Sequence, residues 1–554
     1  MAGEPTANTP PRRTREQIAE QLARYEQEYQ HLPSQRQLAE ELDIPRSTLQ
    51  YWLDRRATLD EDPVMKAFFE SPVGVACLHR LVVAAHVVIT LLGAGGIRLV
   101  CQFVELTGLA PFVASSYSAQ HAVSMAVEKA VVAFGQAETQ RLGAAMPIKP
   151  ITVGEDETFH PAPCLVAMEP ASGFILLEKY TDDRQADTWT QCLAEATQGL
   201  RVEIIQSTSD EGRSLCHHVE QDLGGHHSPD LFHVQQELVQ GCSVALASRH
   251  RQAVKVLAAE LVKGATGRDP SAAPPEDNSG KTPSPQSQAY QTVHTIADQQ
   301  DRVKRAVQGI TTAYHPFDLT TGQAQRDDQL ADALARHVAD IEAVATQAHL
   351  PERCLAKIRK AQRVVIKMVA TLTFFWTMVQ AKVEALALPP TVEHALYTQL
   401  IPGIYLDLVS DKVADPAQRA ALRHQSQALL DSLCPPTGPL ASLNDQERRT
   451  VEAVALECAH LFQRSSSCVE GRNGQLSLHH HALHRLSDRK LTALTTIHNY
   501  FIRRKDGTTA AQRFFGATPN DLFEWVLERV ALPGWSAQKR AHPKPKEYLS
   551  QVAA

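Results

Sequence analysis

The feature that most constrains the fold is a change in the spacing of apolar residues at Lys149. Apolar side chains recur at helical intervals through residues 64–145, whereas from Lys149 onward they alternate with polar ones, as in β-strands. This alternation predicts strands at 149–159, 164–168, 173–180 and 202–210, with a helix at 186–200 before the fourth. A second helix at 216–222 precedes a short fifth strand at 228–234, which leads into a long helix at 235–263.

Three strands, a helix, a strand, a helix and a strand form the order of a ribonuclease H-like α/β fold. In this fold the first and fourth strands lie side by side at the centre of the sheet. Residues 291–463 return to helical spacing without a convincing strand, so we expect a large all-α insertion to interrupt the α/β domain. A tract with five prolines and almost no apolar residues precedes that insertion and predicts a linker.

The 554 residues allow three or four folding units at about 150 residues each. The predicted organisation is a helix-turn-helix at 13–60, a helical domain with a possible second helix-turn-helix at 61–146, the ribonuclease H-like core with the first two acids at 147–263, the Pro-rich linker at 264–290, the all-helical insertion at 291–463, a basic helical segment with a third acid at 464–515, and a C-terminal tail at 516–554.

The N-terminal segment has the spacing of a DNA-binding helix-turn-helix. Ala39 lies in the apolar stripe of one short helix, where a small residue allows close approach, and Leu49 lies in the stripe of the next. The second helix would expose side chains suited to base edges and phosphates: Arg46, Ser47, Gln50, Tyr51 and Arg55. The alternative is an ordinary helical hairpin.

Positive charge is concentrated in one part of the chain. The net charge is −7, which excludes a uniformly basic nucleic-acid coat. Between Leu461 and Lys505, however, eight Lys and Arg residues stand against two acids, which gives a net charge of +6. We therefore expect the DNA backbone to lie along this segment.

Three acids occupy positions where the predicted fold would gather side chains. Asp156 lies on the first strand, on the same face as Gly154, and Asp210 ends the neighbouring fourth strand, so their carboxylates should converge. Glu470 opens the basic helical segment, which can swing it back over the sheet. Clustered carboxylates repel one another unless divalent cations neutralise them, so the trio predicts a site for phosphodiester chemistry with two metal ions. Each acid has the alternative of an ordinary turn or solvated residue, and nearby rivals are Glu155, Glu157, Glu178, Asp182 and Asp183.

At these acids the chain resembles the DDE transposases, in particular the branch with a long helical insertion. The resemblance rests on GEDETF around Asp156, STSDEGRSL around Asp210 and SSSCVEGRNGQLS around Glu470. Prokaryotic members commonly hold the third acid in a Ser/Thr-x-x-Glu-x-x-Asn setting, which here ends at Asn473. The segment from Asp230 to His233 is similar to one in Mutator-like transposases, and the 260 residues from the second acid to the third are similar to the helical insertion of hAT-type enzymes.

The resemblance implies that Asp156, Asp210 and Glu470 hold two Mg²⁺ or Mn²⁺ ions. Water would nick the ends of a mobile element, and the freed 3′-hydroxyl would then attack target DNA. The implied partners are double-stranded DNA, as terminal inverted repeats and as target, and further copies of the chain in a synaptic complex. Phosphates would be held by Arg472, Arg489, Lys490, Arg503 and Arg504, while Asn473 would orient the third acid or touch DNA.

Two other functions fit the same sequence. A transposase-derived regulator would bind specific DNA without cutting it, and a structure-specific nuclease on the same fold would cut without joining.

Trp376 could stack a flipped base, although a core tryptophan is the preferred interpretation. A zinc site is a further hypothesis for the histidine-rich region, although its spacing matches no standard ligand pattern. Its candidate ligands are Cys216, His217, His218, His226, His227 and His233, with His479–His481 and His484 as a second group.

The expected compartment is the cytoplasm, in association with the nucleoid. The sequence shows no secretory signal, and its ten cysteines include no CxxC pair, so they are expected to be free thiols. The apolar run Leu81–Ile97 is interrupted by His86 and falls short of the ~20 residues that a bilayer requires. We expect it to form buried helices, with no membrane partner.

Overall fold

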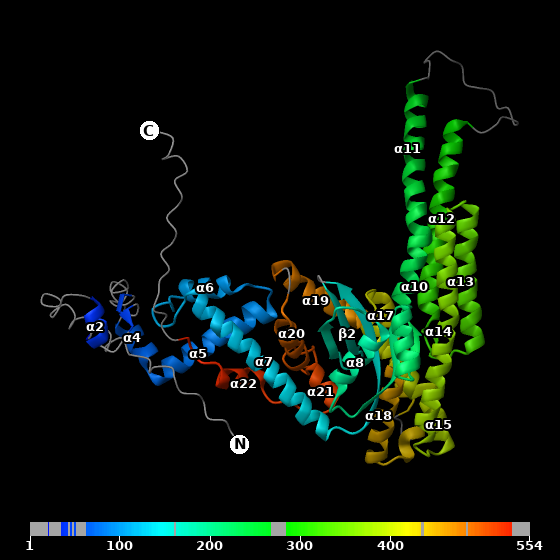
Figure 1. The fold of residues 1–554 in the computed structure, drawn as a ribbon. Coiled ribbons are helices and arrows are strands. Elements are labelled where there is room, and N and C mark those ends of the chain that lie inside the picture. Colours follow the sequence, from blue (N-terminus) through cyan, green and yellow to red (C-terminus); the bar gives the residue numbers. More distant parts are fainter. Residues whose placement is uncertain are drawn as a thin grey trace. The chain divides into compact units, whose positions relative to one another are not determined.

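The computed structural model describes residues 20, 35–41, 45–46, 49–50, 63–159, 162–266, 284–433, 437–483 and 486–533 (Figure 1). Packing divides the chain into two compact units. The first unit comprises residues 1–146, 178–180 and 473–554, and the second comprises residues 147–177 and 181–472. Residues predicted as one basic segment, 464–515, are therefore shared between the two units.

The first unit joins helices from both ends of the sequence. Its long helix α7 (Tyr117–Ala145) packs against α20 (Asp488–Tyr500) and α22 (Leu522–Arg529). The ring of Phe134 on α7 meets the rings of Tyr500 and Trp525 edge-on, which seals this helix interface. The other helices described in this unit are α2 (Gln35–Glu41), α4 (Pro63–Glu70), α5 (Pro72–His86), η2 (Val87–Leu92), α6 (Ile97–Leu106) and α21 (Ala510–Phe515).

The second unit contains a mixed five-stranded sheet in the order β3-β2-β1-β4-β5. Strand β1 (Lys149–Phe159) runs antiparallel to β2 (Pro163–Glu169) and parallel to β4 (Val202–Ser209), and β4 is parallel to β5 (His226–Pro229). Strand β3 (Phe174–Tyr180) completes the edge beside β2. The prediction that the first and fourth strands are central neighbours is confirmed. The fifth strand begins and ends earlier than predicted, at 226–229 instead of 228–234.

Short helices connect the strands, and a helical array follows them. Trp189 on α8 (Ala186–Thr197) is fully buried against one face of the sheet with Leu165 and Leu177. The connecting elements are α9 (Arg213–His217), η3 (His218–Asp222), α10 (Leu231–Leu238) and η4 (Val239–Ser243).

The predicted all-helical insertion is present as a bundle with one extended apolar core. Figure 1 shows α11 (Val244–Thr266), α12 (Pro285–Ala313), α13 (Asp327–Gln347) and α14 (Glu352–Glu384) side by side. The bundle continues through α15 (Pro390–Ala395), η5 (Leu396–Leu400), α16 (Ile401–Lys412), α17 (Pro416–Asp431), η6 (Pro439–Ser442) and α18 (Asp445–Leu461), and α19 (Ser467–Leu483) follows.

Two predicted boundaries need correction. Helix α11 continues to Thr266 and α12 begins at Pro285, so residues at both ends of the predicted linker 264–290 are helical, and 267–283 lie outside the described residues. The predicted tail 516–554 contains α22, whose buried Val526 belongs to the core of the first unit. An eight-residue amphipathic helix gives only a weak periodic signal, which explains why the sequence pattern missed it.

The segment predicted as an N-terminal helix-turn-helix is described only in part. Helix α2 covers the first predicted helix, and Ala39 and Leu49 are buried as expected. The backbone N–H of Leu49 donates to the carbonyl of Pro45 (3.2 Å), and Arg46 and Gln50 are exposed. Ser47, Tyr51 and Arg55 lie outside the described residues.

The possible second helix-turn-helix is not supported. Its helices α6 and α7 are separated by residues 107–116, whereas the motif joins its helices by a turn of about 3–4 residues. Helix α7 has 29 residues and buries side chains along its length, which is typical of a packed connector.

Two described helical stretches, 72–92 and α14, are long and apolar enough to span a membrane by composition alone, with mean hydropathies of 2.1 and 1.5 in their most apolar 18-residue windows. Each also contributes to the core of its own unit, through Leu78 and Val82 in the first stretch and Met368 and Phe375 in the second. His86 in the first stretch is buried and pairs with Gln120 (2.8 Å). Such helices are weak evidence for a membrane, and the absence of a membrane partner stays a prediction.

Candidate functional site

Three aspartates lie in one row across three neighbouring parallel strands, with Asp156 inside β1 and Asp210 and Asp230 directly after β4 and β5. Gly154 of β1 is in register with Thr208 of β4, which is in register with Ser228 of β5. Two residues further along each strand come Asp156, Asp210 and Asp230. Because neighbouring strands lie about 4.8 Å apart, the sheet brings these acids to one edge, as predicted for the first two.

The segment before α19 covers the same face of β1. A Cβ atom on Gly154 would lie 3.1 Å from the Sγ of Cys468, so only glycine allows this approach without displacement. Asp230 fastens the segment, since its Oδ2 accepts hydrogen bonds from the backbone N–H (3.0 Å) and the hydroxyl (2.5 Å) of Ser466. Its Oδ1 accepts from the N–H of Phe232 (2.7 Å) and caps α10. Asp230 thereby ties the start of the helix that carries Glu470 to the end of β5.

The electrostatics show that Glu470 shares the environment of the aspartate row. Burial raises the pKa of Asp156 to about 6, and the carboxylates of Asp210 and Asp230 add to this rise, while the Glu157 amide and His233 oppose it. Burial also raises the pKa of Glu470, to which Asp230 again contributes, and His233 opposes the rise. The two acids therefore experience the same neighbours, Asp230 and His233.

A cavity of about 250 Å³ opens beside the row. Asp210, Asp230 and His233 line it, together with Glu211 and Glu237. Its opposite wall is helix α14 of the insertion, through Lys360, Ala361 and Val364. The sheet and the insertion therefore build one site between them, inside the second unit.

The acids that flank Asp156 point to the other face of the sheet. Glu155 is buried and accepts a hydrogen bond from the hydroxyl of Ser207 (2.6 Å). Glu157 accepts from the indole N–H of Trp189 (3.2 Å) and pairs with Arg184 (2.7 Å). Both have structural partners, which favours Asp156 as the reactive acid of this strand.

In the part of the chain that the structure describes, no three His, Cys, Asp or Glu side chains are gathered closely enough to hold one metal ion. The donor set is nevertheless chemically suited to Mg²⁺ or Mn²⁺, because both ions prefer carboxylate oxygens. Asp156 and Glu470 also have carboxylate neighbours that raise their pKa values, and a nearby cation would relieve that repulsion. The carboxylates therefore suit these ions in chemical type and lie at one edge of the sheet, although no three of the described ones are close enough together to share a single ion.

The histidine-rich region does not converge on one point. The Sγ of Cys216 lies 3.9 Å from the Nε2 of His227, which pairs with Ser209 (3.0 Å). His218 is buried on the other face beside Glu155 (3.6 Å), and His226 stacks on Phe374. These side chains have separate packing roles, so the described residues give no support to a zinc site. His484 lies outside the described residues.

The predicted phosphate contacts in the first unit divide into two kinds. Arg503 and Arg504 are exposed, and their contact with DNA stays a prediction. Lys490 is only 7 % exposed and donates to the carbonyl of Thr90 (2.8 Å), so the prediction that it binds phosphate is wrong. Arg489 pairs with Glu128 (3.0 Å), whose carboxylate also lies beside Lys490.

The two remaining candidates lie on α19. Arg472 is buried, which contradicts a solvent-facing phosphate contact, since the sequence pattern does not distinguish a buried arginine from an exposed one. Asn473 lies three residues after Glu470 on the same helix, and its buried side-chain oxygen forms no hydrogen bond.

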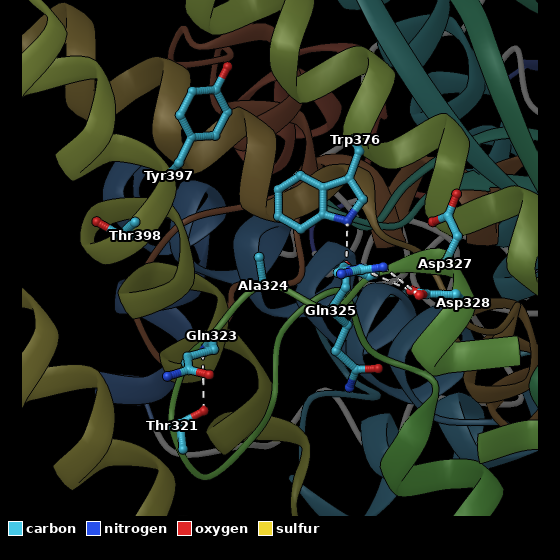
Figure 2. A pocket seen from close by; sticks show the side chains of 11 residues that line it. Thr321, Gln323, Ala324, Gln325, Asp327, Asp328, Trp376, Tyr397 and Thr398 are labelled. Atoms are coloured by element: carbon cyan, nitrogen blue, oxygen red, sulfur yellow. Dashed lines mark hydrogen bonds and ion pairs between the residues drawn. The ribbon is translucent and has the colours of Figure 1, made fainter. Parts of the chain in front are cut away.

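Trp376 faces a second cleft, of about 800 Å³, within the insertion (Figure 2). Its indole N–H donates to the carbonyl of Gln325 (3.1 Å), and its ring packs on Phe317 and Phe375. The charged side chains of the cleft are already engaged, because Arg326 pairs with Asp328 and Asp327 accepts from Thr373. These contacts favour the structural interpretation of Trp376.

Sequence reasoning missed Asp230 and His233 as members of the site. The predicted fifth strand ran through Asp230 to residue 234, whereas β5 ends at Pro229. With the correct boundary, Asp230 directly follows β5, as Asp210 directly follows β4. Thr208 and Ser228 are paired on neighbouring strands, and each is followed two residues later by an aspartate. This shared spacing is the signal that could have revealed Asp230.

The comparisons with known proteins give little functional information. A protein-family profile described as "Family of unknown function (DUF6399)" matches residues 396–542. The matched region includes Glu470 but neither Asp156 nor Asp210. No curated protein matches the chain.

Proposed function

We propose that this chain is a DNA transposase of the DDE type, with a ribonuclease H-like core interrupted by an all-helical insertion. The observation that carries the proposal is the pairing of Gly154 on β1 with Thr208 on the parallel strand β4, because Asp156 and Asp210 each follow two residues later. Glu470 has the same charged neighbours as Asp156, namely Asp230 and His233. Parallel strands order their carboxyl-terminal residues along one edge, which makes this edge a natural site for convergent chemistry.

Asp156 and Asp210 would hold two divalent ions from the sheet, and Glu470 would complete the ligand set from above. When bound, such ions activate an attacking oxygen and stabilise a leaving oxygen in phosphodiester cleavage. Because the pKa of Asp156 is about 6, its carboxylate is ionised above neutral pH and competent to bind a cation. Asp230 would keep the Glu470 segment in position through its hydrogen bonds to Ser466.

The proposed reaction has two stages. Water nicks the element at its ends, and the 3′-hydroxyl released there attacks a phosphodiester of target DNA. Exposed Arg46 and Gln50 would contribute to sequence recognition, and exposed Arg503 and Arg504 to backbone contacts. The proposed setting is the cytoplasm, with the chain associated with the nucleoid as a homo-oligomer.

The test is a cleavage and joining assay on duplex DNA that carries the flanks of the gene, with Mg²⁺ or Mn²⁺. We expect nicking at a fixed position followed by strand joining, and loss of both with Asp210→Asn. Glu155→Gln is the matched control for an acid on the opposite face, and we expect it to cut in proportion to its folded fraction. Activity that persists in Asp210→Asn would contradict the proposal.

A second function, a DNA-binding regulator that does not cut, is favoured by one observation. The described carboxylates are not gathered around a metal position. Specific binding without nicking by wild-type protein would support this alternative, and nicking without joining would support a nuclease.

A further inference from the structure

The first half of α14 is strongly basic. Residues 352–367 contain six basic side chains and one acid, Glu352. The basic residues are Arg353, Lys357, Arg359, Lys360, Arg363 and Lys367. This part of the helix lies in the insertion, far in sequence from the basic segment 464–505.

The structure brings this helix against the carboxylate site. Helix α14 packs along α10 and β5. The η4 turn that follows α10 also lies close to α14. A Cβ atom added to Gly241 of η4 would lie 3.1 Å from the carbonyl oxygen of Cys354 and 3.2 Å from the Cβ of Lys357. The basic half of α14 is thereby held beside the cavity that contains Asp210 and Asp230.

Two lysines of α14 form ion pairs with glutamates that line the cavity. The Nζ of Lys360 lies 2.7 Å from the Oε1 of Glu237, and the Nζ of Lys367 lies 2.7 Å from the Oε2 of Glu211. Both glutamates line the cavity. The lysines are seven residues apart, so they project from one face of the helix about 10 Å apart along its axis. Both remain about half exposed, with 53 % and 45 % of their side chains accessible.

A substrate for this site faces an electrostatic problem. A phosphodiester strand is anionic, and the cavity edge carries the carboxylates of Asp210, Asp230, Glu211 and Glu237. Only the lysine end of each pair is well exposed, since the side chains of Glu237 and Glu211 are 26 % and 19 % exposed, so the ammonium group is the partner that can turn toward a phosphate. Lysine is a flexible point charge that suits such an exchange.

We propose that Lys360 and Lys367 are positioning residues that hold a DNA strand over the aspartate row by exchanging Glu237 and Glu211 for backbone phosphates. The inference rests on the proposed function, since it assigns the substrate contacts of that same site. It predicts that the insertion, and not only the basic segment, binds the DNA that is to be cut.

The experiment measures binding of full-length protein to a fluorescent duplex carrying the gene's flanks, as a function of salt concentration. The double variant Lys360→Gln/Lys367→Gln removes two phosphate contacts, so the slope of log K against log salt should become shallower by about 1.8. Lys360→Arg/Lys367→Arg keeps the charges and should restore the wild-type slope.

Lys382→Gln is the matched control. Lys382 lies on the same helix and forms a similar pair with Glu457 (2.9 Å), but it is about 22 Å further along the helix axis than Lys367. Its loss should leave the slope unchanged, although it removes the same kind of ion pair. A general effect of weakening α14 would appear in Lys382→Gln as well.

The outcomes separate this inference from the proposed function. An unchanged slope in the double glutamine variant, with cleavage intact, overturns the inference alone. A shallower slope in a protein that binds but never nicks supports the phosphate contacts and contradicts the transposase proposal. Absence of binding by the wild-type protein overturns both.

Discussion

Two regions of the molecule gather ionisable side chains, and they differ in how the charges are balanced. In the first unit, Glu128 lies beside Arg489 (3.0 Å) and Lys490 (3.4 Å), so that opposite charges neutralise one another inside the fold. In the second unit, Asp156, Asp210, Asp230 and Glu470 bring like charges together. The first arrangement is complete by itself, whereas the second raises the pKa values of Asp156 and Glu470.

The contrast separates structural charge from functional charge. A buried ion pair needs no further partner, and its removal leaves an uncompensated charge. Clustered carboxylates are costly for the folded chain alone and are typical of sites that act on a ligand or a cation. Opposite effects of substitution on stability are therefore expected in the two regions.

The largest effect is expected at Glu128, which is 8 % exposed. Glu128→Gln leaves the ammonium group of Lys490 buried without its carboxylate, so we expect a loss of stability of about 3–5 kcal/mol. The measurement is the urea or thermal unfolding midpoint of the full chain. A variant as stable as wild type would mean that this charge pair is not structural.

Lys490→Met provides the control for that prediction, because it removes the buried cation and fills similar volume. Since a buried ion pair often contributes little net stability compared with apolar packing, Lys490→Met should destabilise far less than Glu128→Gln. Equal losses in the two variants would point to packing instead of charge.

The second effect has the opposite sign. Asp156→Asn removes a carboxylate whose charge is costly because it is buried and lies beside other carboxylates, and it keeps an acceptor for the N–H of Glu157 (2.8 Å). The pKa of Asp156 is about 6, about two units above that of an ordinary Asp, so the variant should be more stable at pH 7 by on the order of 2 kcal/mol. A destabilised Asp156→Asn protein would contradict the account that the charge of Asp156 is costly in the folded chain.

The pH dependence of stability follows from the same pKa. Above pH 4 the unfolded chain loses the Asp156 proton, while the folded chain keeps it up to about pH 6. This contribution to stability is therefore present below about pH 4 and is lost as pH rises through about 6, and Glu470 acts in the same direction. The unfolding midpoint measured from pH 4 to pH 7 should fall less in Asp156→Asn than in wild type.

A smaller effect is expected from divalent ions. Mn²⁺ at ten times its dissociation constant should stabilise the folded protein by about 1.4 kcal/mol, if it binds the carboxylate row and not the unfolded chain. Thermal unfolding with and without Mn²⁺ should show this shift in wild type and in Lys490→Met but not in Asp156→Asn. A shift that persists in Asp156→Asn would place the ion elsewhere.

Features that depend on residues close together in the sequence, or on the topology of one sheet, could be predicted from the sequence. The strand order and the neighbouring positions of Asp156 and Asp210 followed from alternation along 149–210, because β1 and β4 are long and both become polar in their second halves. The helical insertion followed from sustained 3.6-residue periodicity. These features are local in the sequence or are fixed by the topology of one sheet.

Features that depend on distant contacts could not be predicted in this way. A lysine followed by apolar residues, such as Lys490, is buried only because Glu128 and Thr90 lie beside it. Likewise, the sequence predicts the basic half of α14 only as part of a helical region, since its proximity to Asp210 comes from packing on α10. Asp230 was missed because a strand boundary was misplaced by five residues, which is the kind of error that short strands invite.

The central claim is that Asp156, Asp210 and Glu470 form one divalent-ion site. The most direct measurement is calorimetric titration of Mn²⁺ into wild-type protein and into Asp156→Asn, Asp210→Asn and Glu470→Gln, with Glu155→Gln as the control. The account predicts saturable binding of Mn²⁺ in wild type and in Glu155→Gln, and weakened binding in each of the three site variants. Equal affinity in wild type and in all three variants would contradict it.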